Sequence, residues 1–128
     1  MTWADWIDFL VSEKSQIVKA GIYGHNGSKW ASSNNLKATP AEIRWINNIF
    51  IDPAHAQENG FHIAGVKMVY ISEDKEEGII QASDGNSPIT IYKSPRSIII
   101  GIGRPDAVRG NVTTAVTKMG EKLEAFGY

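Results

Sequence analysis

The sequence contains no cysteine, so it has neither a disulfide framework nor the cysteine ligands of most structural zinc sites. It also lacks an excess of one charge, because 13 Lys and Arg against 14 Asp and Glu give a formal net charge of -1. No apolar run approaches the length of a membrane span, and no signal-peptide pattern opens the chain. We therefore expect a cytoplasmic protein that is not an integral membrane protein and binds no nucleic acid.

Motifs for covalent chemistry are missing as well. The three histidines, His25, His55 and His62, do not have the spacing of paired metal ligands. There is no GxSxG or GKS/GKT motif, and IGIGRPD has an aspartate where a dinucleotide-binding loop needs its third glycine. We interpret Gly101 and Gly103 as positions of close packing or of a β-bulge. These absences predict no enzyme activity, no metal site and no cofactor.

What the sequence does contain is a sheet-forming centre between two helical ends. Its 128 residues, 42% of them hydrophobic, suffice for one domain spanning residues 1–128. Runs rich in Ile, Val and Tyr predict strands of an antiparallel sheet at 17–24, 28–33, 61–72, 78–83, 88–93 and 97–103. Asn26 and Gly27 predict a two-residue primed turn between the first two strands, with both residues at positive φ.

Helical patterns occur at three places. Thr39, Pro40 and Glu42 form a capping-box pattern that predicts a helix through Phe50. The first helix, over residues 3–11, is apolar around more than half of its circumference. The last helix, from about 108 to 126, carries a narrow apolar stripe that consists of Val112, Ala115, Val116, Met119 and Leu123. Together with the strands, these helices predict an α+β fold.

The first helix carries more aromatic side chains than packing on a sheet requires. Ile7 and Leu10 supply an apolar stripe of the usual width, so Trp3, Trp6 and Phe9 are surplus. Two interpretations remain open. Either the terminal helices bury these rings against each other, or the rings line a solvent-facing groove for a polyproline II segment, whose free carbonyls accept hydrogen bonds from indole N–H groups.

The order and spacing of several motifs resemble the profilin family across essentially the whole chain. These motifs are WADWID, AGIYGHNGSKWA, TPAEI, NGFHIAGVKMVYI, SPITIYKSPRSIIIGI and a C-terminal helix that ends in an aromatic residue. The resemblance implies a central antiparallel β-sheet with the N- and C-terminal helices on one face and smaller helices on the other. It also implies a cytoplasmic, cytoskeleton-associated protein that binds monomeric actin, proline-rich proteins and often phosphoinositides, and that regulates actin filament assembly.

The resemblance also implies which residues bind polyproline. The matching positions are Trp3, Trp6, Trp30 and Tyr128. Three positions depart from the family pattern: Trp6 replaces the usual Tyr, Lys122 replaces a common Tyr or His, and Phe9 replaces a side chain that is polar in some members. We expect a working polyproline site with altered affinity.

For actin, the resemblance points to the sheet edge and the start of the last helix. The matching positions are Lys67, Lys93, Gly110, Thr113, Thr117 and Lys118. Basic residues outnumber acidic ones from Pro88 onward, which suits an acidic protein partner. The alternative is that these scattered charges only solvate the surface. Thr113 and Thr117 also replace the Asn and acidic residues that are often found there.

Phosphoinositide binding is expected to be weak. Many profilins carry a Lys/Arg-rich turn before the strand that matches PITIYK, whereas this chain has QASDGN, and fewer cations attract a polyanionic head group less strongly. Lys93 and Arg96 remain as candidate ligands. The alternative to the whole interpretation is a PAS-like small-molecule sensory domain, in which a sheet with flanking helices holds a ligand.

Overall fold

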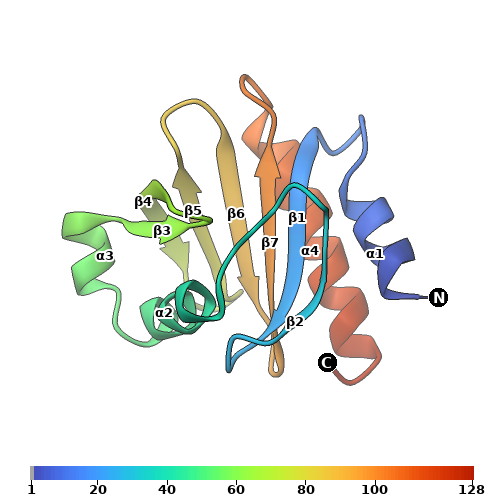
Figure 1. Cartoon of the computed structure of the whole chain (residues 1–128), viewed down its shortest axis with the longest axis horizontal. Helices are drawn as coiled ribbons and strands as arrows, with labels where there is room; N and C mark the ends of the chain where they lie inside the picture. The colour runs from blue at the N-terminus through green and yellow to red at the C-terminus, as the bar shows by residue number, and fades with distance from the viewer. Residues whose placement is uncertain (1) are drawn as a thin grey trace.

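The computed structural model describes residues 2–128 and consists of a seven-stranded antiparallel sheet with helices on both sides (Figure 1). The helices are α1 (Trp3–Leu10), α2 (Pro40–Ile51), α3 (Ala54–Asn59) and α4 (Arg109–Ala125). The strands are β1 (Ile17–Gly24), β2 (Lys29–Ser32), β3 (Phe61–Ile63), β4 (Val66–Asp74), β5 (Ile79–Ser83), β6 (Pro88–Lys93) and β7 (Ser97–Gly103). Their order across the sheet is β2-β1-β7-β6-β5-β4-β3. The predicted α+β class is confirmed.

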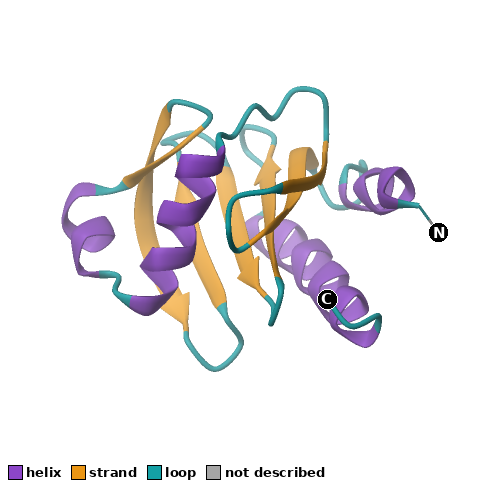
Figure 2. Cartoon of the chain, turned by 60° about the horizontal axis from the view of Figure 1, so that its bottom comes forward, coloured by secondary structure: helices purple, strands orange, loops and turns teal. Residues whose placement is uncertain are grey.

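Different helices cover the two faces of the sheet. α1 and α4 lie on one face and α2 and α3 on the other (Figure 1, Figure 2). Because successive side chains of a strand point to opposite faces, one strand supplies both cores. In β7, Ile98 and Ile100 join the core under α2, whereas Ile99 joins the core under α1 and α4. The two ends of the chain therefore pack on the same side, as expected.

Capping boxes fix where α1 and α2 begin. In α2, the Glu42 N–H donates to Thr39 Oγ1 at 3.2 Å, and the Thr39 N–H donates to Glu42 Oε1 at 2.8 Å, so the predicted box is confirmed. An equivalent box between Thr2 and Asp5, which was not predicted, begins α1. Each box satisfies two backbone N–H groups that the helix itself leaves unpaired.

Glu42 has a second structural role, because its carboxylate also accepts hydrogen bonds from the N–H groups of Ala64 at 2.8 Å and Gly65 at 2.9 Å. Burial alone would raise the pKa of Glu42, but the bonds from Thr39, Gly65 and Ala64 stabilise the charged form and hold the pKa below its usual value. The stability that this carboxylate contributes is therefore present above its unfolded-state pKa and lost as the pH falls through its folded-state pKa.

The prediction of one strand over residues 61–72 was wrong. Ala64 at φ 53° and Gly65 at φ 78° form a two-residue turn of the primed kind. Ile63 then pairs with Val66, so β3 and β4 form a hairpin. The turn was not predicted from the sequence, because alanine rarely adopts positive φ.

The predicted turn at Asn26 and Gly27 was also wrong in type. Only Gly27, at φ 97°, has positive φ. The Gly24 N–H donates to the Ser28 carbonyl at 2.8 Å, and the Gly27 N–H donates to the Gly24 carbonyl at 3.0 Å. Three residues, 25–27, therefore lie between the hydrogen-bonded residues Gly24 and Ser28, and the glycine supplies the left-handed conformation that such a turn needs.

The last helix packs closely on the sheet. Every residue of its predicted apolar stripe is buried. A Cβ atom at Gly101 would lie 2.5 Å from Cγ2 of Val116, and one at Gly103 would lie 2.9 Å from Cγ2 of Val112. The expectation that Gly101 and Gly103 serve close packing is confirmed.

Within residues 2–128, none of the helices combines the length and the apolar character that crossing a bilayer requires.

Candidate functional site

Three aromatic rings meet where α1, β2 and the C-terminal residue come together. The ring centroids of Trp3 and Trp30 lie 5.4 Å apart, those of Trp3 and Tyr128 lie 5.3 Å apart, and those of Trp30 and Tyr128 lie 5.5 Å apart. Trp3 and Trp30 are half-buried, and the Tyr128 side chain is 36% exposed. Residues that are far apart in the sequence thus present a continuous set of ring faces and edges to solvent.

Trp6 and Phe126 extend this group. The ring centroid of Trp6 lies 4.7 Å from that of Trp3 and 5.7 Å from that of Phe126. Trp6 is only 5% exposed, so the expectation that it is surplus to the core was wrong. We call Trp3, Trp6, Trp30, Phe126 and Tyr128 the aromatic cluster. Trp6 is therefore part of the core, whereas the rings around it reach solvent.

A hydrogen-bond network holds Tyr128 against the turn between β6 and β7. The Tyr128 backbone oxygen accepts from the Ser94 hydroxyl at 2.8 Å and from the Arg96 N–H at 2.9 Å. His25 Nε2 lies 2.9 Å from the Ser94 carbonyl and 3.2 Å from the Ser97 carbonyl, and since both partners are acceptors we assign its proton to Nε2. Sequence reasoning missed this network because its members are far apart along the chain.

The side of α4 that faces β5 forms a second surface. Gly110, Thr113 and Thr117 share this side at helical spacing. Thr113 Oγ1 accepts a hydrogen bond from Gln81 Nε2 at 3.0 Å and lies 3.1 Å from Thr90 Oγ1. These bonds fix Thr113 at the junction of helix and sheet, so it is not a free surface hydroxyl.

Arg109 anchors the start of α4 beside this junction. Its guanidinium donates to Gln81 Oε1 at 2.9 Å and to the carbonyls of Ala82 at 2.8 Å and Ile89 at 3.1 Å. Burial holds the pKa of Arg109 below its ordinary value. Nothing in the local sequence marks this residue, because its partners lie on two strands.

Two exposed apolar side chains on β4 continue the second surface. Val69 pairs with Ser83, and the β4 register shifts at Ile71, so that Ile71 and Ser72 lie opposite Gln81 on the α4 side of the sheet. Val69 is 57% exposed and Ile71 is 51% exposed. We call Val69, Ile71, Gly110, Thr113 and Thr117 the β4–α4 surface. Its two apolar members were not predicted, because the sequence pattern does not show which strand lies near the sheet edge.

The basic residues predicted to bind actin or phosphoinositides do not gather on the β4–α4 surface. Lys67 pairs with His62 in the β3–β4 hairpin. Lys93 Nζ lies 5.7 Å from the ring centroid of Phe50 in α2, on the opposite face of the sheet. Lys118 lines a hollow between α1 and α4. Arg96 is exposed in the turn between β6 and β7.

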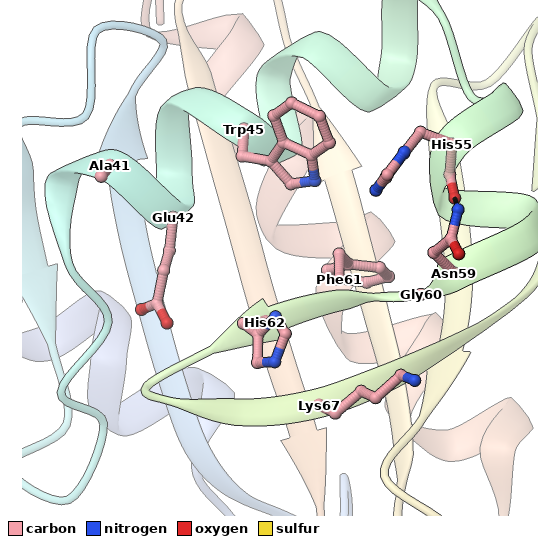
Figure 3. A pocket seen from close by; sticks show the side chains of 9 residues that line it. All are labelled: Ala41, Glu42, Trp45, His55, Asn59, Gly60, Phe61, His62 and Lys67. Atoms are coloured by element: carbon pink, nitrogen blue, oxygen red, sulfur yellow. Dashed lines mark hydrogen bonds between the residues drawn. The ribbon is translucent and has the colours of Figure 1, made fainter.

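A shallow surface groove of about 660 Å³ is lined by residues of α2, α3 and β3 (Figure 3). Trp45 and His55 meet at its upper wall, with ring centroids 5.4 Å apart. The groove contains the Glu42 carboxylate, which already accepts backbone N–H bonds.

The sheet face beneath α2 and α3, where a PAS-like domain would hold a ligand, is filled by buried side chains. Among residues 2–128, no group of His, Cys, Asp and Glu side chains has the arrangement of a metal site.

Comparisons with known proteins agree on one family. A family model described as Profilin matches residues 1–128. Profilin-2 of Acanthamoeba castellanii is 27% identical over 128 residues, which covers 100% of both chains. The crystal structure of profilin II from the same organism superposes with a TM-score of 0.89 at 26% identity, covering 99% of this chain and 100% of that chain.

Two more distant structures, which share the fold, were solved with partners. Mouse profilin IIa in complex with a double repeat from the FH1 domain of mDia1 has a TM-score of 0.83 at 18% identity, and 100% of each chain is covered. LokiProfilin2 in complex with rabbit actin has a TM-score of 0.75 at 19% identity, covering 96% of this chain and 97% of that chain.

Proposed function

The chain belongs to the profilin family, and from that membership we propose that it binds monomeric actin and proline-rich segments and thereby regulates actin filament assembly. Members of this family are actin-binding regulators and not enzymes. We propose further that it acts in the cytoplasm in association with the cytoskeleton. The observation that carries the proposal is the aromatic cluster, which the fold assembles from both ends of the chain.

The chemistry of the aromatic cluster suits a polyproline II helix. Such a segment presents pyrrolidine rings and free carbonyl oxygens and has few N–H donors. The half-buried rings of Trp3 and Trp30 offer flat apolar faces, and indole N–H groups can donate to the carbonyls. Because the ligand helix is preformed, little conformational entropy is lost on binding. The FH1 complex of the mouse relative supports this assignment.

Polyproline binding is tested by titrating the protein with poly-L-proline while tryptophan fluorescence is recorded. We expect a saturable change, because Trp3, Trp6 and Trp30 lie together in the aromatic cluster. A glycine-serine peptide of equal length is the control and should cause no change. A folded protein that gives no response to either peptide would contradict the assignment.

The β4–α4 surface is the part of the molecule that we propose for actin. It combines exposed Val69 and Ile71 with the flank of α4 that carries Gly110, Thr113 and Thr117. An exposed apolar patch with a polar rim is typical of a protein interface. Lys67, Lys93 and Lys118 are proposed as outlying charged contacts that steer association with an acidic partner. The actin complex of LokiProfilin2 supports the choice of partner.

Replacing both Val69 and Ile71 by aspartate should weaken the affinity for monomeric actin at least about tenfold, because two exposed apolar side chains become charged within the contact. The measurement is a titration of labelled actin monomers. Ile51→Asp is the matched control, since Ile51 is 69% exposed on α2, on the opposite face. Poly-L-proline titration of each variant reports whether it is folded. Equal loss of actin affinity in the control would contradict the assignment.

We propose that phosphoinositide binding is weak. Lys93 shares its surroundings with Glu73, Glu76 and Glu77, and these carboxylates oppose a polyanionic head group. Arg96 is exposed in the turn between β6 and β7 and is the second candidate cation. In sedimentation with phosphatidylcholine vesicles, adding phosphatidylinositol bisphosphate should increase the bound fraction only slightly, and physiological salt should remove the increase. Strong binding that persists in salt would contradict this expectation.

A further inference from the structure

The exposed surface next to the aromatic cluster continues between the two terminal helices. α1 and α4 run antiparallel here, since Trp6 meets Phe126 and, one turn further along, Phe9 meets Lys122. Lys122 Nζ lies 5.3 Å from the ring centroid of Phe9, whose side chain is 44% exposed. Beyond this pair is a hollow of about 490 Å³ whose lining includes Phe9 and Lys118. We call the stretch from Phe9 and Lys122 to Lys118 the α1–α4 seam.

Cations dominate the α1–α4 seam. Lys14 and Lys118 line the hollow and are exposed, and Lys122 stands at its entrance over Phe9. The carboxylate that lines the hollow is Asp8. The stretch is therefore positive in a protein whose formal net charge is -1.

Of the two acidic residues of α4, Glu124 contacts the sheet and Glu121 is exposed, and neither of them lines the hollow. Glu124 accepts a hydrogen bond from the Tyr92 hydroxyl at 3.0 Å. Burial, together with the charges of Glu124 and Glu121, raises the pKa of Tyr92 to about 12. Glu13, in the loop after α1, is exposed and lies outside the lining of the hollow.

We propose that the α1–α4 seam is a subsite for acidic residues that flank the proline stretch of a peptide ligand. The proposal rests on polyproline binding at the aromatic cluster and names the ligands that this chain prefers. Two observations carry it: the seam is continuous with the cluster through Trp6, Phe126 and Phe9, and its charge is complementary to carboxylates. Profilins commonly have an aromatic residue at the position of Lys122. In this chain the lysine offers a charged contact there in place of a ring that would pack on proline.

The spacing of the lysines predicts where the acidic residues belong. On α4, Lys122 and Lys118 lie about 6 Å and about 12 Å from Phe126, at about 1.5 Å per residue of helix. A polyproline II segment advances about 3.1 Å per residue. Carboxylates about two to four residues beyond the last ring-bound proline therefore reach the seam. The ligand is a proline-rich protein segment with an acidic flank at one end.

The test compares proline decamers that differ only in their flanks. Calorimetric titration at low salt is carried out with decaproline followed by Gly-Ser residues, decaproline with three aspartates at either end, and decaproline with three lysines at either end. Because an exposed charge pair contributes modestly and is screened by salt, we expect one acidic peptide to bind about fivefold more tightly than the neutral one. This gain should disappear at high salt.

Variants then assign the gain to the seam. Lys118→Gln and Lys122→Gln together remove the two lysines that the spacing places within reach, and should bring the ratio of the affinities for acidic-flanked and neutral decaproline from about five close to one. Lys75→Gln, which removes one charge, is the control, because Lys75 lies in the turn between β4 and β5 and does not line the α1–α4 seam. It should leave the gain unchanged.

The possible results are distinct. Equal affinities for acidic, neutral and basic flanks would overturn the subsite while leaving polyproline binding intact. A gain that survives in the double variant would overturn its location. An aspartate peptide without proline that binds as tightly as the flanked decamer would mean a general anion site and would also overturn the proposal. If even the neutral decamer fails to bind, the proposed polyproline function itself fails.

Discussion

Replacing Trp3 by alanine should weaken binding of decaproline by at least about 30-fold, the effect of losing an interfacial tryptophan hot spot. The Trp3 ring contacts the rings of Trp6, Trp30 and Tyr128, so its loss removes a binding face and leaves the others without their shared neighbour. Calorimetry is the suitable measurement, because the substitution itself changes the tryptophan fluorescence. Actin affinity should change by less than about twofold, since the β4–α4 surface lies elsewhere.

Two further variants make this result specific. Trp45→Ala removes a tryptophan that is 40% exposed on α2, on the opposite face, and should leave decaproline binding unchanged. Trp3→Phe keeps an aromatic face but removes the indole N–H, and an intermediate affinity would separate ring packing from hydrogen bonding. Retention of full affinity by Trp3→Ala would eliminate the aromatic cluster as the polyproline site. Unfolding of Trp3→Ala would instead assign Trp3 to the core.

Replacing Trp6 by alanine should lower the free energy of unfolding by about 3–5 kcal/mol, the range for deleting a large aromatic side chain from a core. Trp6 is 5% exposed and packs within the core of α1, α4 and the sheet. The expected loss is a large part of the stability of a small domain. Urea denaturation followed by circular dichroism measures it, and an unchanged dependence on urea would indicate that the unfolding transition is still cooperative.

Phe9→Ala is the control for this stability prediction, because Phe9 is on the same helix but is 44% exposed. Its loss should lower the free energy of unfolding by less than about 1 kcal/mol. A Trp6→Ala variant as stable as Phe9→Ala would show that the ring of Trp6 is not part of the core. Trp3 and Trp6 are three residues apart, yet the first is expected to act on binding and the second on stability.

Much of the fold could be predicted because local patterns determined it. The periodicity of α4 and the capping box of Thr39 and Glu42 depend on residues within one helix, and the structure confirms both. The hairpin at Ala64 and Gly65 could not be predicted, because the flanking residues all favour strands and the turn depends on Glu42 accepting both N–H groups. The short helix α3 was missed because six residues carry too little periodicity to detect.

The candidate site was less predictable than the fold. Helical projection placed Trp6 on the surplus side of α1, because it contains no information about the end of α4 that covers this side chain. The exposure of Val69 and Ile71 was not predicted, because apolar residues in a strand are expected to be buried. Only the strand order shows that β4 lies next to the edge strand of the sheet. Contacts between distant elements decided these outcomes.

The aromatic cluster can form only when both ends of the chain come together during folding. Trp3 and Tyr128 lie near opposite ends of the chain, so their contact closes nearly the longest loop that the polypeptide can form and carries a correspondingly large entropy cost. The strand pairings of β4, β5, β6 and β7 join neighbours in the sequence and close much shorter loops. We therefore expect competence to bind the ligand to appear late in folding, after the strands β4 to β7 have paired.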